Sequence, residues 1–281
     1  MDVAIGLPNA VPGTTGEQLT EWARRAESRR FSSLGTIDRI AYPNYEPLTA
    51  LAAAAAVTES IGLCTSVLLG PLRANSVVLA KQALSVHALS GGRLTLGIGL
   101  GGRDDDYGPA GLEVGHRGKE LDSMLARITE VWDGDAMGPA VDSPPSLIVG
   151  GAVDASFARA ARFGEGWIAS GMPPDQFAAM AEKVNAAWKA AGRDGEPRQM
   201  ALAYFSLGDG AEENARAYLE DYYAWLGPET AGYIANSAAK DAETVKQYVS
   251  AFEGAGCDEL IMFPSSSDPD QVDLLADALG R

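Results

Sequence analysis

Short apolar runs alternate with amphipathic stretches from one end of the chain to the other, and this alternation restricts the fold more than any other feature. Each run has the length of a strand, and each is followed by residues with helical periodicity. Such a pattern is typical of a parallel sheet whose strands are connected by crossover helices. We count eight pairs, with strands expected at residues 3–7, 33–37, 63–69, 94–100, 146–149, 167–170, 200–207 and 259–263.

Helices are expected between these strands. Pro174 and Pro269 stand at early helical positions, where the missing N–H of proline does no harm, and they support two of the helices. Two long connections, residues 101–118 and 227–240, are of the kind that serves as lids or binding loops. The expected helices cover residues 17–29, 47–60, 76–89, 119–132, 155–163, 174–191, 212–225, 242–253 and 269–279.

The number of strand–helix units and the chain length together indicate the architecture. Eight units in 281 residues, 46% of them hydrophobic, favour an α/β fold of the (β/α)8 TIM barrel type over an open doubly wound sheet. We expect a single domain that covers residues 1–281. In such barrels the functional residues lie on the loops after the strands, so we expect the site, with extended loops, at the C-terminal mouth.

Charge and composition exclude several classes of partner. The formal net charge is −16 and the basic residues form no run, so the chain would repel nucleic acid and anionic lipid. The longest apolar stretch, residues 48–57, is far too short to cross a bilayer, and the first residues enter a strand without a leader pattern. We therefore expect a cytoplasmic protein that acts on a small molecule.

Cysteines and histidines are too few for a metal centre or a disulfide framework. Cys64 and Cys257 lie far apart, and Cys64 falls inside an apolar run, so we expect two reduced, buried thiols. His87 and His116 are the only histidines, which argues against zinc. We expect no metal site.

Residues 97–102, with the sequence GIGLGG, have the G-x-G-x-x-G spacing of a dinucleotide-binding fold. Such a motif must open a helix, whereas here the acidic stretch RDDDYGP follows, and the motif comes at the fourth strand instead of the first. Two other interpretations remain. Gly99, Gly101 and Gly102 let the backbone lie against a planar ring, or they allow close packing of strand and helix.

Several segments between residue 1 and about residue 170 are specific in combination. Asp38-Arg39 ends one of them, and the stretch SGGRLTLGIG is another. Through these segments the chain resembles the bacterial luciferase-like superfamily, which contains flavin-dependent monooxygenases and coenzyme F420-dependent oxidoreductases. The matching residues are 31–39, 61–68, 90–99, 107–111, 117–122, 131–132, 144–151 and 160–167.

The resemblance implies a cofactor site at the third, fourth and fifth strands. In similar F420 enzymes a non-prolyl cis peptide on the third strand supports the back of the deazaflavin ring, and Ser66-Val67 would be the matching pair here. An ordinary buried strand is the alternative. The full set of expected cofactor-binding residues is Asp38, Thr65, Ser66, Val67, Gly99, Gly101, Gly102, Gly150 and Gly151.

Phosphate and other anionic groups have two candidate sites. Gly150-Gly151 precedes a helix, so its backbone N–H groups either receive a phosphate or form a simple turn. Four arginines fall in or beside the loops of the mouth, where they form a cationic rim or pair with the acidic residues 104–106. These arginines are Arg39, Arg73, Arg103 and Arg117.

Few residues are candidates for proton transfer. Asp38 ends the second strand at the mouth, and His116 and Tyr107 lie in the long fourth loop, although a lone loop histidine is usually just exposed. Similar sugar-phosphate dehydrogenases carry a His after this Asp and a Glu at the end of the glycine motif. Arg39 and Gly102 stand there in this chain, which argues against oxidation of glucose 6-phosphate.

The resemblance implies a function and leaves two alternatives. We expect hydride transfer between coenzyme F420 and a small organic substrate. The first alternative is an FMN-dependent monooxygenase in which Tyr107 or His116 lines the oxygenation pocket. The second is a barrel that binds flavin or deazaflavin without catalysis. Related barrels often dimerise through early helices, so a homodimer is also expected.

Overall fold

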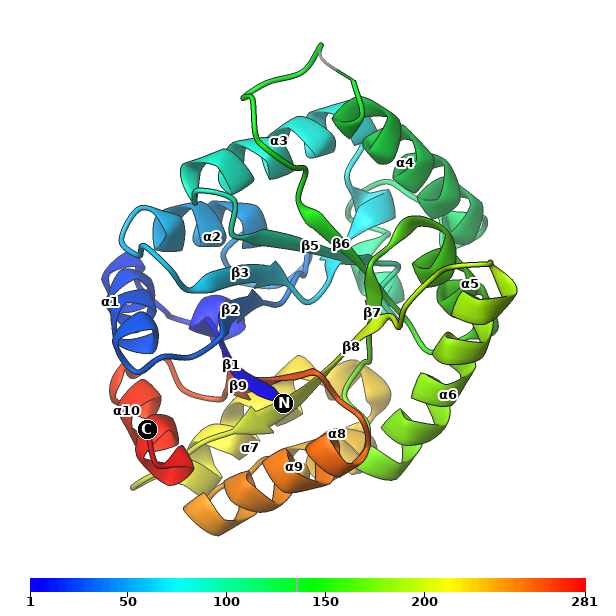
Figure 1. The fold of residues 1–281 in the computed structure, drawn as a ribbon. Helices are drawn as coiled ribbons and strands as arrows, with labels where there is room; N and C mark the ends of the chain where they lie inside the picture. Colours follow the sequence, from blue (N-terminus) through cyan, green and yellow to red (C-terminus); the bar gives the residue numbers. More distant parts are fainter. Residues whose placement is uncertain (135) are drawn as a thin grey trace.

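The computed structural model describes residues 1–134 and 136–281. In these residues, parallel strands form one closed sheet in the order β3-β2-β1-β9-β8-β7-β6-β5-β4, and pairing of β3 with β5 completes the ring (Figure 1). β3 and β4 share one position, so the (β/α)8 barrel predicted from the alternation is confirmed. The strands are Asp2–Gly6 (β1), Ser33–Thr36 (β2), Gly62–Thr65 (β3), Leu68–Leu69 (β4), Leu94–Gly99 (β5), Ser146–Gly150 (β6), Gly166–Ile168 (β7), Arg198–Phe205 (β8) and Glu259–Pro264 (β9).

Helices surround the sheet on its outer side, and the first and last of them lie side by side (Figure 1). No helix in the described ranges is long and apolar enough to cross a membrane. The helices are Gly16–Ser28 (α1), Pro47–Ala55 (α2), Ser76–Leu89 (α3), Arg117–Trp132 (α4), Asp154–Phe163 (α5), Pro174–Ala190 (α6), Ala211–Tyr222 (α7), Pro228–Ser237 (α8), Ala242–Gly254 (α9) and Asp270–Leu279 (α10).

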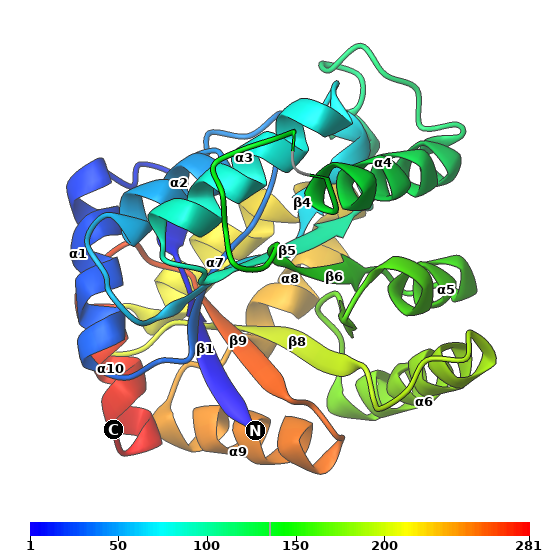
Figure 2. The same ribbon diagram turned by 45° about the horizontal axis from the view of Figure 1, so that its top comes forward.

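The last strand closes the barrel. β9 lies between β1 and β8, with Ile5 opposite Met262 on one side and Tyr204 opposite Phe263 on the other (Figure 2). Outside the strands, α10 is held against α1 by ion pairs, among them Arg25 to Asp273 at 3.0 Å. Closure therefore depends on both a strand and a helix from the C-terminal end of the described chain.

Alternate residues of the strands face two apolar regions. The larger region lies between strands and helices and includes Trp22, Trp167 and Phe177, each fully buried. The smaller one includes Ile148 and Ile261 from the strands and also residues of α7. Because a strand points successive side chains to opposite sides, one apolar run supplies both regions, which explains why the runs are almost continuously hydrophobic.

Three predicted elements differ from the structure. The third strand, expected at residues 63–69, is interrupted between β3 and β4, where the Ser66–Val67 peptide is cis. The second helix ends at Ala55 instead of residue 60. Residues 227–240, expected to be an open connection, contain α8, because Gly227 at φ 86° and Pro228 at the first helical position together start a helix.

The two cysteines provide a test of the closed barrel. Burial raises the pKa of both Cys64 and Cys257 to about 12. At pH 8 we expect a disulfide reagent to label the native thiols on the order of 10³-fold more slowly than unfolded ones, because only the thiolate reacts. Labelling of both thiols in guanidinium chloride is the control. Rapid labelling of the native protein would contradict the enclosed positions of these side chains.

Candidate functional site

A cavity of about 820 Å³ opens at the C-terminal ends of the strands. Its lining comes from residues at or just after the ends of β2, β5, β6, β7 and β8, from the segment between β3 and β4, and from α4, α5, α7, α8 and α9. A second hollow of about 770 Å³ is lined by residues at the starts of β6 and β8, such as Ser146 and Arg198. Catalytic residues of barrels of this kind lie at the C-terminal mouth, so the first cavity is the candidate site.

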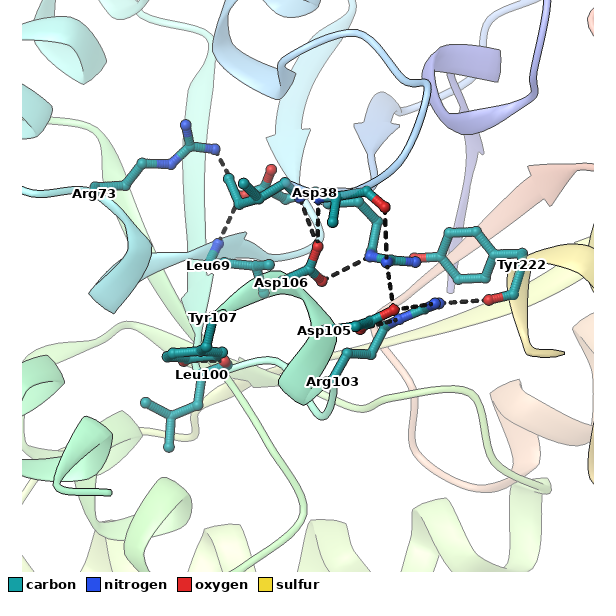
Figure 3. A network of polar contacts seen from close by, with 12 residues as sticks. Asp38, Leu69, Arg73, Leu100, Arg103, Asp105, Asp106, Tyr107 and Tyr222 are labelled. Atoms are coloured by element: carbon teal, nitrogen blue, oxygen red, sulfur yellow. Dashed lines mark hydrogen bonds and ion pairs between the residues drawn. The ribbon is translucent and has the colours of Figure 1, made fainter. Parts of the chain in front are cut away.

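Asp38 follows β2 and lines this cavity with a buried carboxylate. Its Oδ2 accepts hydrogen bonds from the backbone N–H of Leu69 at 2.8 Å and from Arg73 at 2.7 Å (Figure 3). Its Oδ1 has no hydrogen-bond partner in the described residues. Burial raises the pKa of Asp38, and Arg73 together with the Leu69 N–H partly offsets that rise. Asp38 thus keeps one oxygen for a ligand.

Val67 forms a ledge at the base of the cavity. The cis peptide expected at Ser66–Val67 is present, and both residues line the cavity. A Cβ on Gly99 would lie 2.8 Å from Val67 Cγ2, and one on Gly150 would lie 2.8 Å from Val67 Cγ1. These two glycines therefore make room for Val67. Sequence reasoning expected a ring to lie directly against Gly99, whereas the structure puts the side chain of Val67 in that space.

The other expected cofactor residues lie in different surroundings. Gly101, Gly102 and Gly151 all line the cavity. At Gly102 the nearest atom to an added Cβ is Trp225 Cη2 at 3.7 Å, so the backbone there is open to a ligand. Thr65 is fully buried outside the lining, and its hydroxyl donates to Gly97 O at 2.6 Å. Its contacts support the strand beneath the ledge.

Arginines on the α4–α5 side of the cavity carry positive charge. Arg159 pairs with Asp122 at 2.7 Å and also donates to a backbone carbonyl of α4. Arg117 lies 3.7 Å from Asp104, and its Nη1 has no hydrogen-bond partner in the described chain. Both arginines line the cavity near Gly151. This side can therefore receive an anionic group.

An aromatic wall covers the opposite side. We use this name for five lining residues contributed by β8, by the end of α7 and by the segment that follows it. Sequence reasoning missed these residues. Tyr222 follows Tyr218 at the spacing of one helix face, which is typical of packing against the core and gives no sign of a cavity. The residues of the aromatic wall are Tyr204, Tyr222, Tyr223, Trp225 and Tyr233.

Two arginines contact the rings at the edge of this wall. The guanidinium of Arg39 lies 5.2 Å from the Tyr42 ring and 5.5 Å from the Tyr222 ring. Arg103 lies 5.2 Å from the Tyr222 ring and 5.2 Å from the Trp225 ring. Each guanidinium thus makes cation–π contacts with two rings, and these contacts hold the rings in place.

Two aspartates neutralise these arginines. Asp106, which is buried, accepts from Arg39 Nε at 2.7 Å and from the backbone N–H groups of Ile40 and Ala41 (Figure 3). Asp105 accepts from Arg39 at 3.2 Å and from both Nε and Nη2 of Arg103. The cationic rim expected from the sequence is thus compensated here. On the α4–α5 side Arg159 pairs with Asp122, and Arg117 lies 3.7 Å from the exposed Asp104.

Tyr107 and His116 lie away from the cavity lining that the described residues form. Tyr107 is buried, and its hydroxyl donates to Leu100 O at 2.6 Å. His116 is exposed and precedes α4 with a left-handed φ of 68°. Neither side chain therefore reaches the cavity in this arrangement.

Comparison with known proteins agrees with this architecture. The sequence profile of the family described as "Luciferase-like monooxygenase" matches residues 1–261. The chain belongs to this family. Its members and structural neighbours are oxidoreductases and monooxygenases, and the protein is accordingly a luciferase-like oxidoreductase.

Individual relatives are more distant. The uncharacterized protein Rv0940c of Mycobacterium tuberculosis is 31% identical over 207 residues, which cover 61% of this chain and 71% of that protein. A solved F420-dependent secondary alcohol dehydrogenase, in complex with an F420–acetone adduct, has a TM-score of 0.82 at 18% identity, with 99% and 98% of the two chains covered. Monooxygenase RslO1 from Streptomyces bottropensis has a TM-score of 0.82 at 19% identity, with the same coverage.

Proposed function

We propose that the protein is an F420-dependent oxidoreductase that transfers a hydride between the deazaflavin and a small organic substrate. The observation that carries this proposal is the Val67 ledge at the base of the cavity, with Gly99 and Gly150 around it and Asp38 beside it. The likeness in fold to an F420-dependent alcohol dehydrogenase supports it.

The residues present fit such a cofactor. Val67 and the open backbone at Gly102 offer a surface for a planar ring, and the free Oδ1 of Asp38 offers a hydrogen-bond acceptor. Arg117 and Gly151 would hold the anionic part. When bound, the cofactor supplies a hydride donor or acceptor at its C5. The protein orients the reactants and excludes water from the enclosed part of the cavity.

A flavin-dependent monooxygenase is the second candidate. The same ledge suits the ring of FMN, and a monooxygenase has as high a structural similarity to this chain as the dehydrogenase has. A protein that binds either cofactor without catalysis is the third candidate, because neither His116 nor Tyr107 reaches the cavity to act as an acid. The cytoplasmic location and the homodimer expected from the sequence stay predictions.

A binding titration distinguishes these candidates. Purified protein is titrated with oxidised F420 and separately with FMN, and binding is followed by cofactor fluorescence at physiological salt. We expect F420 to bind at least about 10-fold more tightly than FMN, which corresponds to about 1.4 kcal/mol. Preference for FMN would favour monooxygenation. Binding of neither would overturn the proposal, and binding without turnover of any tested substrate would favour a carrier.

A further inference from the structure

The cavity has two chemically different sides. On the α4–α5 side, the carboxylate of Asp104 lies 3.7 Å from Arg117 and is 76% exposed, so it compensates the charge of Arg117 only loosely. On the aromatic wall, the charges of Arg39 and Arg103 are balanced by Asp105 and Asp106. An anionic group is therefore attracted to the first side, and the aromatic wall suits an uncharged ligand.

The rings of the wall are held in place before any ligand arrives. Arg103 contacts the rings of both Tyr222 and Trp225, and its Nη1 donates to the carbonyl oxygen of Tyr222. Trp225 is 43% exposed and lies within 4 Å of the space over Gly102. Fixed aromatic surfaces bind planar apolar ligands well, since little side-chain freedom is lost.

A pair of hydroxyl groups supplies the polar contact on this side. The hydroxyls of Tyr204 and Tyr223 lie 2.9 Å apart, and either can be the donor. Whichever accepts keeps its own proton, and no acceptor for that proton lies within hydrogen-bond distance among the described residues. Burial raises the pKa of both phenols, so both stay protonated at neutral pH. The pair thus offers one O–H donor.

We propose that the aromatic wall binds an uncharged aromatic carbonyl compound, whose oxygen accepts a hydrogen bond from the Tyr204–Tyr223 pair. Trp225 and Tyr233, the exposed rings of the wall at 43% and 67%, supply the apolar contact, and the hydroxyl pair selects for an oxygen at one end of the ligand. Such a compound would be the substrate of the proposed oxidoreductase, so its role as a substrate rests on the proposed function. Its binding can be measured without a cofactor.

Three probes of similar shape test this. Methyl naphthyl ketone carries the oxygen, isopropenylnaphthalene has a methylene group in its place, and naphthoate carries a negative charge. Equilibrium dialysis against the wild-type protein gives the three affinities. We expect the ketone to bind about 10-fold more tightly than the hydrocarbon, as one well-placed hydrogen bond allows, and more tightly than naphthoate. Equal binding of ketone and hydrocarbon, or tighter binding of naphthoate, would overturn the inference.

Variants assign the effect to the hydroxyl pair. In Tyr204→Phe/Tyr223→Phe the preference for the ketone should fall to about 1-fold, while affinity for the hydrocarbon is retained. Tyr218→Phe is the matched control, because Tyr218 is buried next to Tyr204 but lies outside the cavity lining, and it should keep the preference. Retention of the preference in the double variant would refute the role of the pair. If that variant does not fold, the wild-type comparison of the three probes still decides.

The same samples separate this inference from the proposed function. Each is titrated with F420 and FMN in parallel. If F420 binds and ketone and hydrocarbon do not differ, the inference fails and the cofactor proposal stands. If neither cofactor binds and the ketone is preferred, the cofactor proposal fails and the aromatic wall stands as a carbonyl-binding surface.

Discussion

Replacement of Asp106 by alanine is expected to lower the free energy of unfolding by about 3–5 kcal/mol, the range for removing one partner of a buried ion pair. The side chains of Asp106 and Arg39 are 1% and 2% exposed. Without Asp106, Asp105 is the one ionic partner that Arg39 keeps among the described residues, and the N–H groups of Ile40 and Ala41 lose their acceptor. Chemical denaturation monitored by circular dichroism measures the effect.

A neighbouring aspartate provides the control for this prediction. Asp104 belongs to the same short turn, but its side chain is 76% exposed and its nearest cation is 3.7 Å away. Asp104→Ala should therefore change stability by less than about 0.5 kcal/mol. Because Arg39 also touches the Tyr222 ring, Asp106→Ala should weaken binding of methyl naphthyl ketone as well. Equal stability of the two variants would show that the buried pair contributes nothing.

Replacement of Gly99 by alanine is expected to cost about 2 kcal/mol of stability and about 10-fold in affinity for F420. The new Cβ would lie 2.8 Å from Val67 Cγ2, closer than carbon atoms tolerate, so Val67 must move toward the cavity. Because the collision involves this single side chain, Val67→Ala in the Gly99→Ala background should restore most of the lost stability. Thermal unfolding and F420 fluorescence are the two readouts.

A double-mutant cycle makes the prediction specific. Stability of the wild type, the two single variants and the double variant gives a coupling free energy, which we expect to exceed about 1 kcal/mol. Gly102→Ala is the control, because the nearest atom to its added Cβ is 3.7 Å away, an ordinary contact. Additive effects of the two substitutions would contradict the packing of Val67 against Gly99.

Much of the fold could be predicted from local sequence patterns. Each strand of the barrel lies within a few residues of its predicted range, because the apolar runs are nearly continuous and turn residues separate them. α8 was missed, since the Gly227-Pro228 pair was interpreted as part of a long connection although it also starts helices. The interruption between β3 and β4 followed only from the family resemblance, because residues 63–69 contain no glycine or proline that would divide the run into two strands.

The site was predictable in part. Asp38 and the glycines at the strand ends could be assigned to the mouth, since the position of a residue after a strand determines which end of the barrel it occupies. The role of Gly99 could not be predicted, because it depends on contact with the side chain of Val67, which lies between β3 and β4. The pairing of Tyr204 with Tyr223 likewise joins β8 to the end of α7 and leaves no local signal.

The position of β9 has a consequence for synthesis on the ribosome. Until residues 259–264 have emerged, β1 and β8 each present an open edge, and the barrel cannot close. The nascent chain must therefore keep the edge of β1 from pairing with other chains until β9 has been made. A chain truncated before residue 259 would have both edges exposed, and we expect it to aggregate or to be degraded by proteases.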